Sequence, residues 1–231
     1  ISSVNTAVTV EITGTTTINT TTISTTGIQT YGGDVTLEAD AVLTGTTVTF
    51  NEDIDGNGAS DVTAHDLTIT GTAVFGDAAE ETVNGVDVLE VSVNATFISS
   101  VNTAVTVEVT GTTAINTTTI TTTGTQTYHG NVTLESNTTL TGSTVTFNED
   151  IDGNGALNVT AHDLTITGTA VFGDAAEDKV NGIADLTVNG NAAFTSSIDT
   201  AALISVTGTT TINTTTITTS GTQTYHGNVT L

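Results

Sequence analysis

Short stretches in which apolar and polar residues alternate recur along the chain, separated by glycine, asparagine and aspartate. The first 97 residues contain VTVEI (8–12), TTTINTTTI (15–23), DVTL (34–37), TVTF (47–50), DLTIT (66–70) and VLEVSV (88–93). Alternation with a period of two over four to six residues is typical of half-buried β-strands. The pattern therefore predicts an all-β fold of short strands joined by tight turns.

The sequence repeats itself with a period of 97 residues. TAHDLTITGTAVFGDAAE begins at Thr63 and again at Thr160, without insertion or deletion between them. Loops between separate domains vary in length, whereas stacked layers do not tolerate insertions in their strands. We therefore divide the sequence into a first copy (1–97), a second copy (98–194) and the start of a third copy (195–231), and we predict that they form one continuous solenoid.

The alternating stretches are spaced by 19–20 residues on average, which corresponds to one turn of a parallel β-solenoid and about five turns per copy. About 12 turns are expected in total, with strands about 4.8 Å apart. An immunoglobulin-like sandwich of about 100 residues is the alternative fold. The absence of Trp and Pro and the 4% aromatic content argue against the sandwich. The predicted core contains the equivalents, in both copies, of Val35, Leu37, Val48, Phe50, Leu67, Ile69 and Val74.

Charge and composition limit the partners that the chain can have. The chain has 25 acidic residues, one basic residue and a formal net charge of −24. This excess of negative charge argues against binding to nucleic acid, whose phosphates require Lys and Arg, and against anionic membrane surfaces. No apolar stretch reaches the roughly 20 residues of a membrane span. Without cysteine, the fold has no disulfides to stabilise it.

The repeat style resembles that of a known protein class. The pattern T-x-G-x-Q-T-Y-x-G-x-V-T-L, followed by L-T-G-x-x-V-T-F and then I-D-G, is similar to the Thr/Gly-rich repeats of large filamentous-haemagglutinin-like bacterial proteins. The resemblance covers the whole chain. It implies a right-handed parallel β-helix with an extracellular adhesive or structural role, and it carries over no catalytic residues.

The stretch FNEDIDGNGA, at 50–59 and again at 147–156, contains the start of a calcium-binding pattern. An EF-hand loop supplies ligands at positions 1, 3, 5, 7, 9 and 12. Position 12, counted from Asp53, is Ala64, so the bidentate glutamate is missing, and the flanking residues predict strands. We therefore interpret the stretch as a turn between strands, with a weak calcium site as the alternative. The ligands of that alternative site are Asp53, Asp55, Asn57 and Asp61 in the first copy and Asp150, Asp152, Asn154 and Asn158 in the second.

Enzymatic and ice-binding functions are less consistent with the sequence. A carbohydrate-active β-helix needs a unique cluster of carboxylates, but here acidic residues are repeated or exchanged between copies: Asp34 becomes Asn131. His65 and Asp66 are neighbours, and neighbours in a strand face opposite sides. The threonine arrays could in principle order water as ice-binding surfaces do, but threonine is also a common strand former.

The sequence thus predicts a non-catalytic segment of the shaft of a large extracellular or surface-exposed bacterial adhesin or matrix fibre, such as those of biofilms. A repeated calcium-binding module that stiffens or cross-links fibres is the alternative, and a carbohydrate-active enzyme is a weaker one. No cofactor is required unless calcium binds. The expected partners are more of the same polypeptide or like subunits end to end, and a glycan or protein of a host or cell surface at a tip outside this chain.

Overall fold

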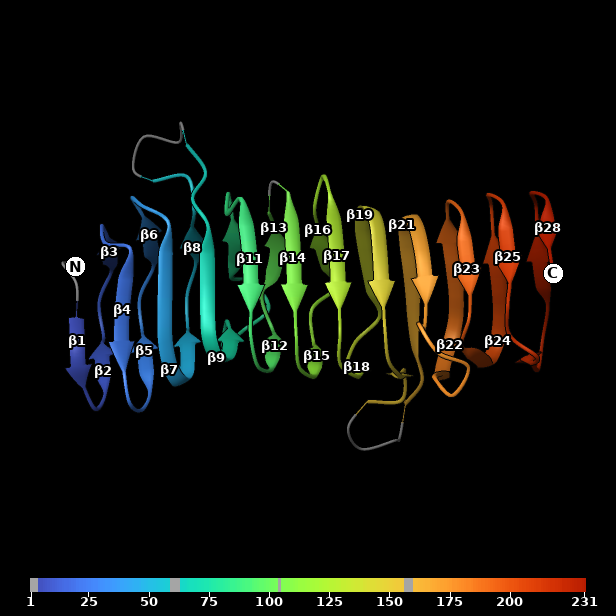
Figure 1. Cartoon of the computed structure of the whole chain (residues 1–231), viewed down its shortest axis with the longest axis horizontal. Coiled ribbons are helices and arrows are strands. Elements are labelled where there is room, and N and C mark those ends of the chain that lie inside the picture. The colour runs from blue at the N-terminus through green and yellow to red at the C-terminus, as the bar shows by residue number, and fades with distance from the viewer. Residues whose placement is uncertain (1–3, 59–62, 104, 156–159) are drawn as a thin grey trace. The chain divides into compact units, whose positions relative to one another are not determined.

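The computed structural model describes residues 4–58, 63–103, 105–155 and 160–231. The chain divides into two compact units, Ile1–Gly111 (unit 1) and Thr112–Leu231 (unit 2), and each is described by itself. Both are built from parallel β-strands (Figure 1), and no helix occurs among the described residues. The predicted all-β parallel solenoid is confirmed, with about 11 turns of roughly 19 residues.

Unit 1 contains fourteen strands among its described residues. They are β1 Val4–Ala7, β2 Val10–Ile12, β3 Thr16–Ile18, β4 Thr22–Thr25, β5 Gln29–Tyr31, β6 Val35–Leu37, β7 Ala41–Phe50, β8 Ile54–Asp55, β9 Leu67–Phe75, β10 Thr82–Asn84, β11 Val88–Val91, β12 Ala95–Phe97, β13 Ser100–Asn102 and β14 Thr106–Val109.

The strands of unit 1 stack in three parallel columns. Column A contains β1, β4, the first halves of β7 and β9, β11 and β14. Column B contains β2, β5, the second halves of β7 and β9, and β12. Column C contains β3, β6, β8, β10 and β13. One turn of the solenoid therefore passes once through A, B and C.

Unit 2 is built in the same way from fourteen strands among its described residues. They are β15 Thr113–Ile115, β16 Thr119–Thr121, β17 Thr125–Tyr128, β18 Val132–Leu134, β19 Thr138–Phe147, β20 Ile151–Asp152, β21 His162–Phe172, β22 Lys179–Asn189, β23 Ala192–Phe194, β24 Ser197–Val206, β25 Thr210–Ile212, β26 Ile217–Thr219, β27 Gln223–Tyr225 and β28 Val229–Thr230.

The columns of unit 2 are named D, E and F. Column D contains β15, β18, β20, the first halves of β22 and β24, and β26. Column E contains β16, the first halves of β19 and β21, the second halves of β22 and β24, and β27. Column F contains β17, the second halves of β19 and β21, β23, β25 and β28.

The turns are not all of one length. In column C, Thr17 lies beside Thr36, and Thr36 beside Asp55, so these partners are 19 residues apart. Asp55 lies beside Asn84, which is 29 residues further along the chain. The longer turn includes the loop between β8 and β9, and it explains why the chain makes about 11 turns and not the predicted 12.

The predicted core is confirmed except at one position. Val35, Leu37, Val48, Phe50, Leu67 and Ile69 of the first copy are at most 1% exposed. Val74, which was predicted to be buried, is half-buried, because its neighbours Ala73 and Phe75 point inward. Val74 instead lies beside Thr49 in the register of β7 and β9. Its equivalent Val171 in the second copy is half-buried as well.

Aromatic rings stack from turn to turn inside column B. The rings of Tyr31, Phe50, Phe75 and Phe97 follow one another with centroid separations of 5.2, 5.8 and 5.1 Å and nearly parallel planes. A second stack of four, beginning at Tyr128, lies inside column F of unit 2. Such stacks add to area burial and link each turn to its neighbours.

A buried glutamine satisfies polar groups inside each stack. In unit 2, Gln126 and Tyr128 are fully buried. The Nε2 of Gln126 donates to the carbonyl oxygens of Ile120 (3.0 Å) and Thr141 (2.8 Å), and its Oε1 accepts from the Tyr128 hydroxyl (3.1 Å). Gln29 makes the equivalent bonds in unit 1. Burying an amide is tolerated here because its hydrogen bonds are made.

Candidate functional site

The predicted calcium ligands lie where one turn of the solenoid passes into the longer turn. Asp53 precedes β8 and Asp55 ends it, and Asp150 and Asp152 flank Ile151 of β20 in the same way. Ile54 and Ile151 are buried, so the aspartates on either side of each face outward. Two of the eight predicted ligands, Asp61 and Asn158, lie outside the described residues.

The second aspartate of each motif closes a tight turn. The Oδ1 of Asp55 accepts a hydrogen bond from the backbone N–H of Asn57 at 2.9 Å, and Asp152 does the same for Asn154 at 2.9 Å. An aspartate that caps the backbone two residues on is the hallmark of an Asx turn. In the described part of each motif, the structure thus agrees with the interpretation as a turn.

The first aspartate of each motif holds the next turn of the solenoid. The Oδ1 of Asp53 accepts from the backbone N–H of Thr82 at 2.7 Å and from its hydroxyl at 3.1 Å. Asp150 accepts from the backbone N–H of Lys179 at 2.8 Å. Each of these carboxylates therefore already has a structural partner.

The asparagine of the motif packs on a glycine of the next turn. Gly85 has φ +66°, and a Cβ added there would overlap the side chain of Asn57. Gly182, with φ +68°, is covered by Asn154 in the same way. Glycine is required at these positions both because φ is positive and because the asparagine lies so close.

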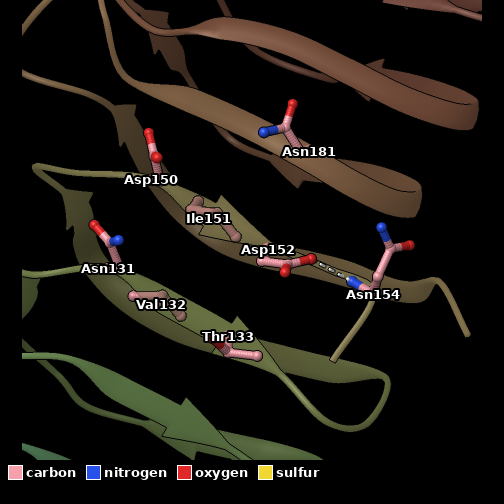
Figure 2. Close-up of a pocket in the computed structure, with 8 residues that line it drawn as sticks. All are labelled: Asn131, Val132, Thr133, Asp150, Ile151, Asp152, Asn154 and Asn181. Atoms are coloured by element: carbon pink, nitrogen blue, oxygen red, sulfur yellow. Dashed lines mark hydrogen bonds between the residues drawn. The ribbon is translucent and has the colours of Figure 1, made fainter. Parts of the chain in front are cut away.

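In unit 2 these residues border a polar pocket of about 320 Å³ on the outer surface of column D (Figure 2). Figure 2 shows side chains from three successive strands of the column around it. The lining residues are Asn131, Val132, Thr133, Asp150, Ile151, Asp152, Asn154 and Asn181.

Sequence reasoning identified three of these lining residues and missed the others. Asp150, Asp152 and Asn154 belong to one continuous segment, as a calcium loop would require. Asn131 and Thr133 come from the turn before, and Asn181 from the turn after. The neighbouring strands could have been found from the sequence, because the first and second copies both have the motif V-T-L one turn before the I-D-G motif and the motif V-N-G one turn after it.

The pocket offers the oxygen ligands that calcium prefers, but few charges. Ca²⁺ takes six to eight oxygens from carboxylates, amides, carbonyls and water. Here two carboxylates, three amides and a threonine hydroxyl surround the space. Among the described residues, however, no three His, Cys, Asp or Glu side chains form a group that could hold a metal ion. Asp150 and Asp152 supply the negative charge among the described residues that line the pocket.

The equivalent position in the first copy is more acidic. Asp34 stands where the second copy has Asn131, and Thr82 where it has Lys179, the only basic residue of the chain. Nearby, the pKa of the exposed Glu52 is raised by desolvation and by the negative charges of Glu81 and Asp77, as well as by those of Asp34 and Asp53. The first copy therefore concentrates negative charge where the second copy has partly neutralised it.

A second acidic group lies directly before three strands of column A, β7, β9 and β11. The Oδ1 of Asp40 accepts from the N–H of Asp66 at 3.1 Å and lies 3.4 Å from Nδ1 of His65. Burial raises the pKa of Asp66, as do the charges of Asp40 and Asp87, while a hydrogen bond from the Val88 N–H and the nearby His65 lower it. The side-chain contact of His65 is thus with Asp40 of the preceding turn.

Comparison of the chain with protein-family models, with curated protein sequences and with solved structures found no match. None of the described residues belongs to a helix long and apolar enough to cross a membrane.

Proposed function

We propose that this chain is a non-catalytic segment of the shaft of a large extracellular bacterial fibre, either the stalk of an adhesin or a component of a biofilm matrix. The observation that carries the proposal is the stacking of equivalent side chains and backbone groups from turn to turn, seen in the ring stack of column B. Each turn then contacts only its neighbours, so such a shaft can be lengthened by adding copies.

The distribution of polar residues supports the same role. The side chains that alternate with the core along each strand are mostly threonine, serine, asparagine and acidic residues. With a net charge of −24, neighbouring fibres repel one another and stay soluble. Under this proposal the partners are further turns of the same polypeptide or like subunits, and a host or cell-surface glycan or protein bound at a tip.

Surface labelling of the bacterium that makes this protein tests the proposal. Antibodies raised against this chain are added to intact cells and to lysed cells, with an antibody against a cytoplasmic enzyme as the control. We expect this chain to be labelled on intact cells and the cytoplasmic enzyme only after lysis. Labelling of this chain only after lysis would overturn the extracellular role.

A test of catalysis is separate from that of location. The purified chain is incubated with plant and bacterial polysaccharides, and new reducing ends and unsaturated sugars are measured. We expect neither above the level of a heat-denatured sample. Formation of these products in proportion to the concentration of the chain would favour the carbohydrate-active alternative.

The pocket on column D favours a calcium-binding module as the second candidate function. Calorimetric titration of the chain with CaCl₂ tests it, using Asp152→Asn and, as a control with the same charge change elsewhere in unit 2, Asp185→Asn. A specific site predicts that the first substitution removes the binding heat and the second does not. An equal loss of binding heat in both variants indicates that calcium only screens the negative charge. If the unchanged chain gives no binding heat up to about 10 mM calcium, the calcium-binding function is excluded.

A further inference from the structure

The sequence repeat and the turns of the solenoid are out of step. In unit 1, β1 of the first copy lies in column A, but β13, its equivalent 97 residues later, stacks on β10 in column C. Likewise, β2 lies in column B, whereas its equivalent β14 stacks on β11 in column A. The second copy therefore begins one column earlier than the first.

Unit 2 shows the same displacement independently. Strand β15 of the second copy lies in column D, beside β18. Its equivalent in the third copy, β25, lies in column F, beside β23. Within this unit the third copy again begins one column earlier than the second.

These registers fix how far one copy advances. From β2 to β14, the chain completes four full turns and two of the three columns of a fifth. The same count holds from β15 to β25. A 97-residue copy is therefore four and two-thirds turns, which means that equivalent side chains of consecutive copies lie on different sides of the solenoid.

We infer that the equivalent outer surfaces of three consecutive copies face three different directions around the solenoid. Where this register continues from copy to copy, a surface returns to the same side only after three copies, which is 14 turns or about 67 Å at about 4.8 Å per turn. Any contact that is made to one such surface per copy is therefore distributed over three sides of the solenoid. This inference concerns the surface alone and does not depend on the proposed role as a shaft.

Disulfide formation between outward-facing positions tests the register in unit 1, and the chain has no native cysteine to interfere. Glu108 of β14 is the equivalent of Glu11 of β2 and lies beside Glu90 of β11. If a copy were exactly five turns, Glu108 would instead follow Thr96 of β12 in column B. The informative variants are therefore Glu90→Cys/Glu108→Cys and, as the matched control, Thr96→Cys/Glu108→Cys.

We expect the first pair to form a disulfide under mild oxidation, because neighbouring parallel strands place registered Cα atoms within the 4.4–6.8 Å that a disulfide spans. The control pair lies in two different columns and should stay reduced. Circular dichroism of both reduced variants confirms that they are folded. Bonding in the control pair, in both pairs or in neither overturns the inference, because a fixed register brings only the first pair together.

Unit 2 supplies a second, independent test of the same kind. Ser205 of β24 is the third-copy equivalent of Glu108 and lies beside Thr187 of β22. The pair Thr187→Cys/Ser205→Cys should bond, whereas Ala193→Cys/Ser205→Cys, which matches the control above, should not. Bonding that differs between the two units would show that the displacement is not a property of the repeat.

Discussion

The buried amide of Gln126 provides the sharpest test of how the turns are held together. Replacing it with leucine removes two hydrogen bonds to backbone carbonyls and leaves the buried hydroxyl of Tyr128 without its acceptor. A net hydrogen bond contributes about 0.5–1.5 kcal/mol, and a buried polar group without a partner costs about 1–3 kcal/mol. We expect Gln126→Leu to lower the free energy of local opening by about 3 kcal/mol.

A double-mutant cycle separates the contribution of the Tyr128 hydroxyl to stability from that of the hydrogen bonds between Gln126 and the backbone carbonyls. Tyr128→Phe alone leaves the Oε1 of Gln126 without its donor, which should cost about 1.5 kcal/mol. In Gln126→Leu/Tyr128→Phe the unpaired hydroxyl is gone, so the total should fall below that of Gln126→Leu alone, to about 2 kcal/mol, and not reach the additive value of about 4.5 kcal/mol. Thr127→Val, at the outward-facing position between them, is the control and should change stability by less than about 0.5 kcal/mol.

Native-state hydrogen exchange read by mass spectrometry gives the result turn by turn. A loss of about 3 kcal/mol makes exchange through local opening roughly 150-fold faster. Because contacts in a solenoid are between nearest neighbours, the effect should centre on β17 and β19 and be small at β25. Additive energies in the cycle, or an equal loss of protection throughout unit 2, would refute this reasoning.

Three further substitutions or conditions test other features of the fold. Gly71→Ala should destabilise unit 1 by about 3 kcal/mol in urea unfolding, because φ is +156° and a Cβ would overlap the carbonyl oxygen of the adjacent turn, whereas Gly14→Ala has open space and should be tolerated. Asp40→Asn, which copies the second repeat, should lower the pKa of Asp66 in a carbon-13 NMR titration, since one of the charges that raises it is removed. Burial raises the pKa of Tyr31 above its unfolded value of about 10, so its contribution to stability is intact below pH 10 and is lost as the pH rises further. The phenolate absorbance of Tyr31, measured as the difference between the chain and its Tyr31→Phe variant, should therefore appear only together with loss of the strand signal in circular dichroism.

Alternation of apolar and polar residues was sufficient to predict the strands, but not which of two adjacent apolar residues faces inward. The segment that ends β9 reads Ala73, Val74, Phe75, and apolarity alone favoured Val74 for the core. Its orientation is set by the neighbouring turn, where Phe50 needs Phe75 beside it to continue the ring stack. Packing between turns thus decided a choice that the local pattern left open.

One predicted strand is two strands in the structure. The stretch TTTINTTTI was interpreted as one strand, although Ile18 and Ile23 are both fully buried. Residues five apart in one strand face opposite sides, so the chain must turn a corner between them. It does so between β3 and β4. The odd spacing of the two isoleucines is a signal of this corner that is present in the sequence.

The candidate site was only partly predictable because it is not made by one segment. A calcium loop collects its ligands from consecutive residues, and this expectation led to Asp150, Asp152 and Asn154. In a solenoid, the groups nearest to a side chain in space also come from the turns before and after. Asn131 and Asn181 therefore complete the pocket, although their separation in sequence from Asp152 depends on the lengths of the intervening turns.

The displacement between copies was beyond sequence reasoning because all three columns accept the same residues. A parallel strand on any side of the solenoid needs only apolar residues inside and polar residues outside, so an exact sequence repeat does not require an exact number of turns. Ile12 lies on Tyr31 in column B, yet its equivalent Val109 lies on Val91 in column A. Val109 is fully buried and Ile12 is half-buried, so both columns accept an aliphatic side chain on their inner side. Selection on packing can therefore keep a 97-residue copy unchanged while its surfaces rotate, and only a function that required every copy to face one way would have prevented this.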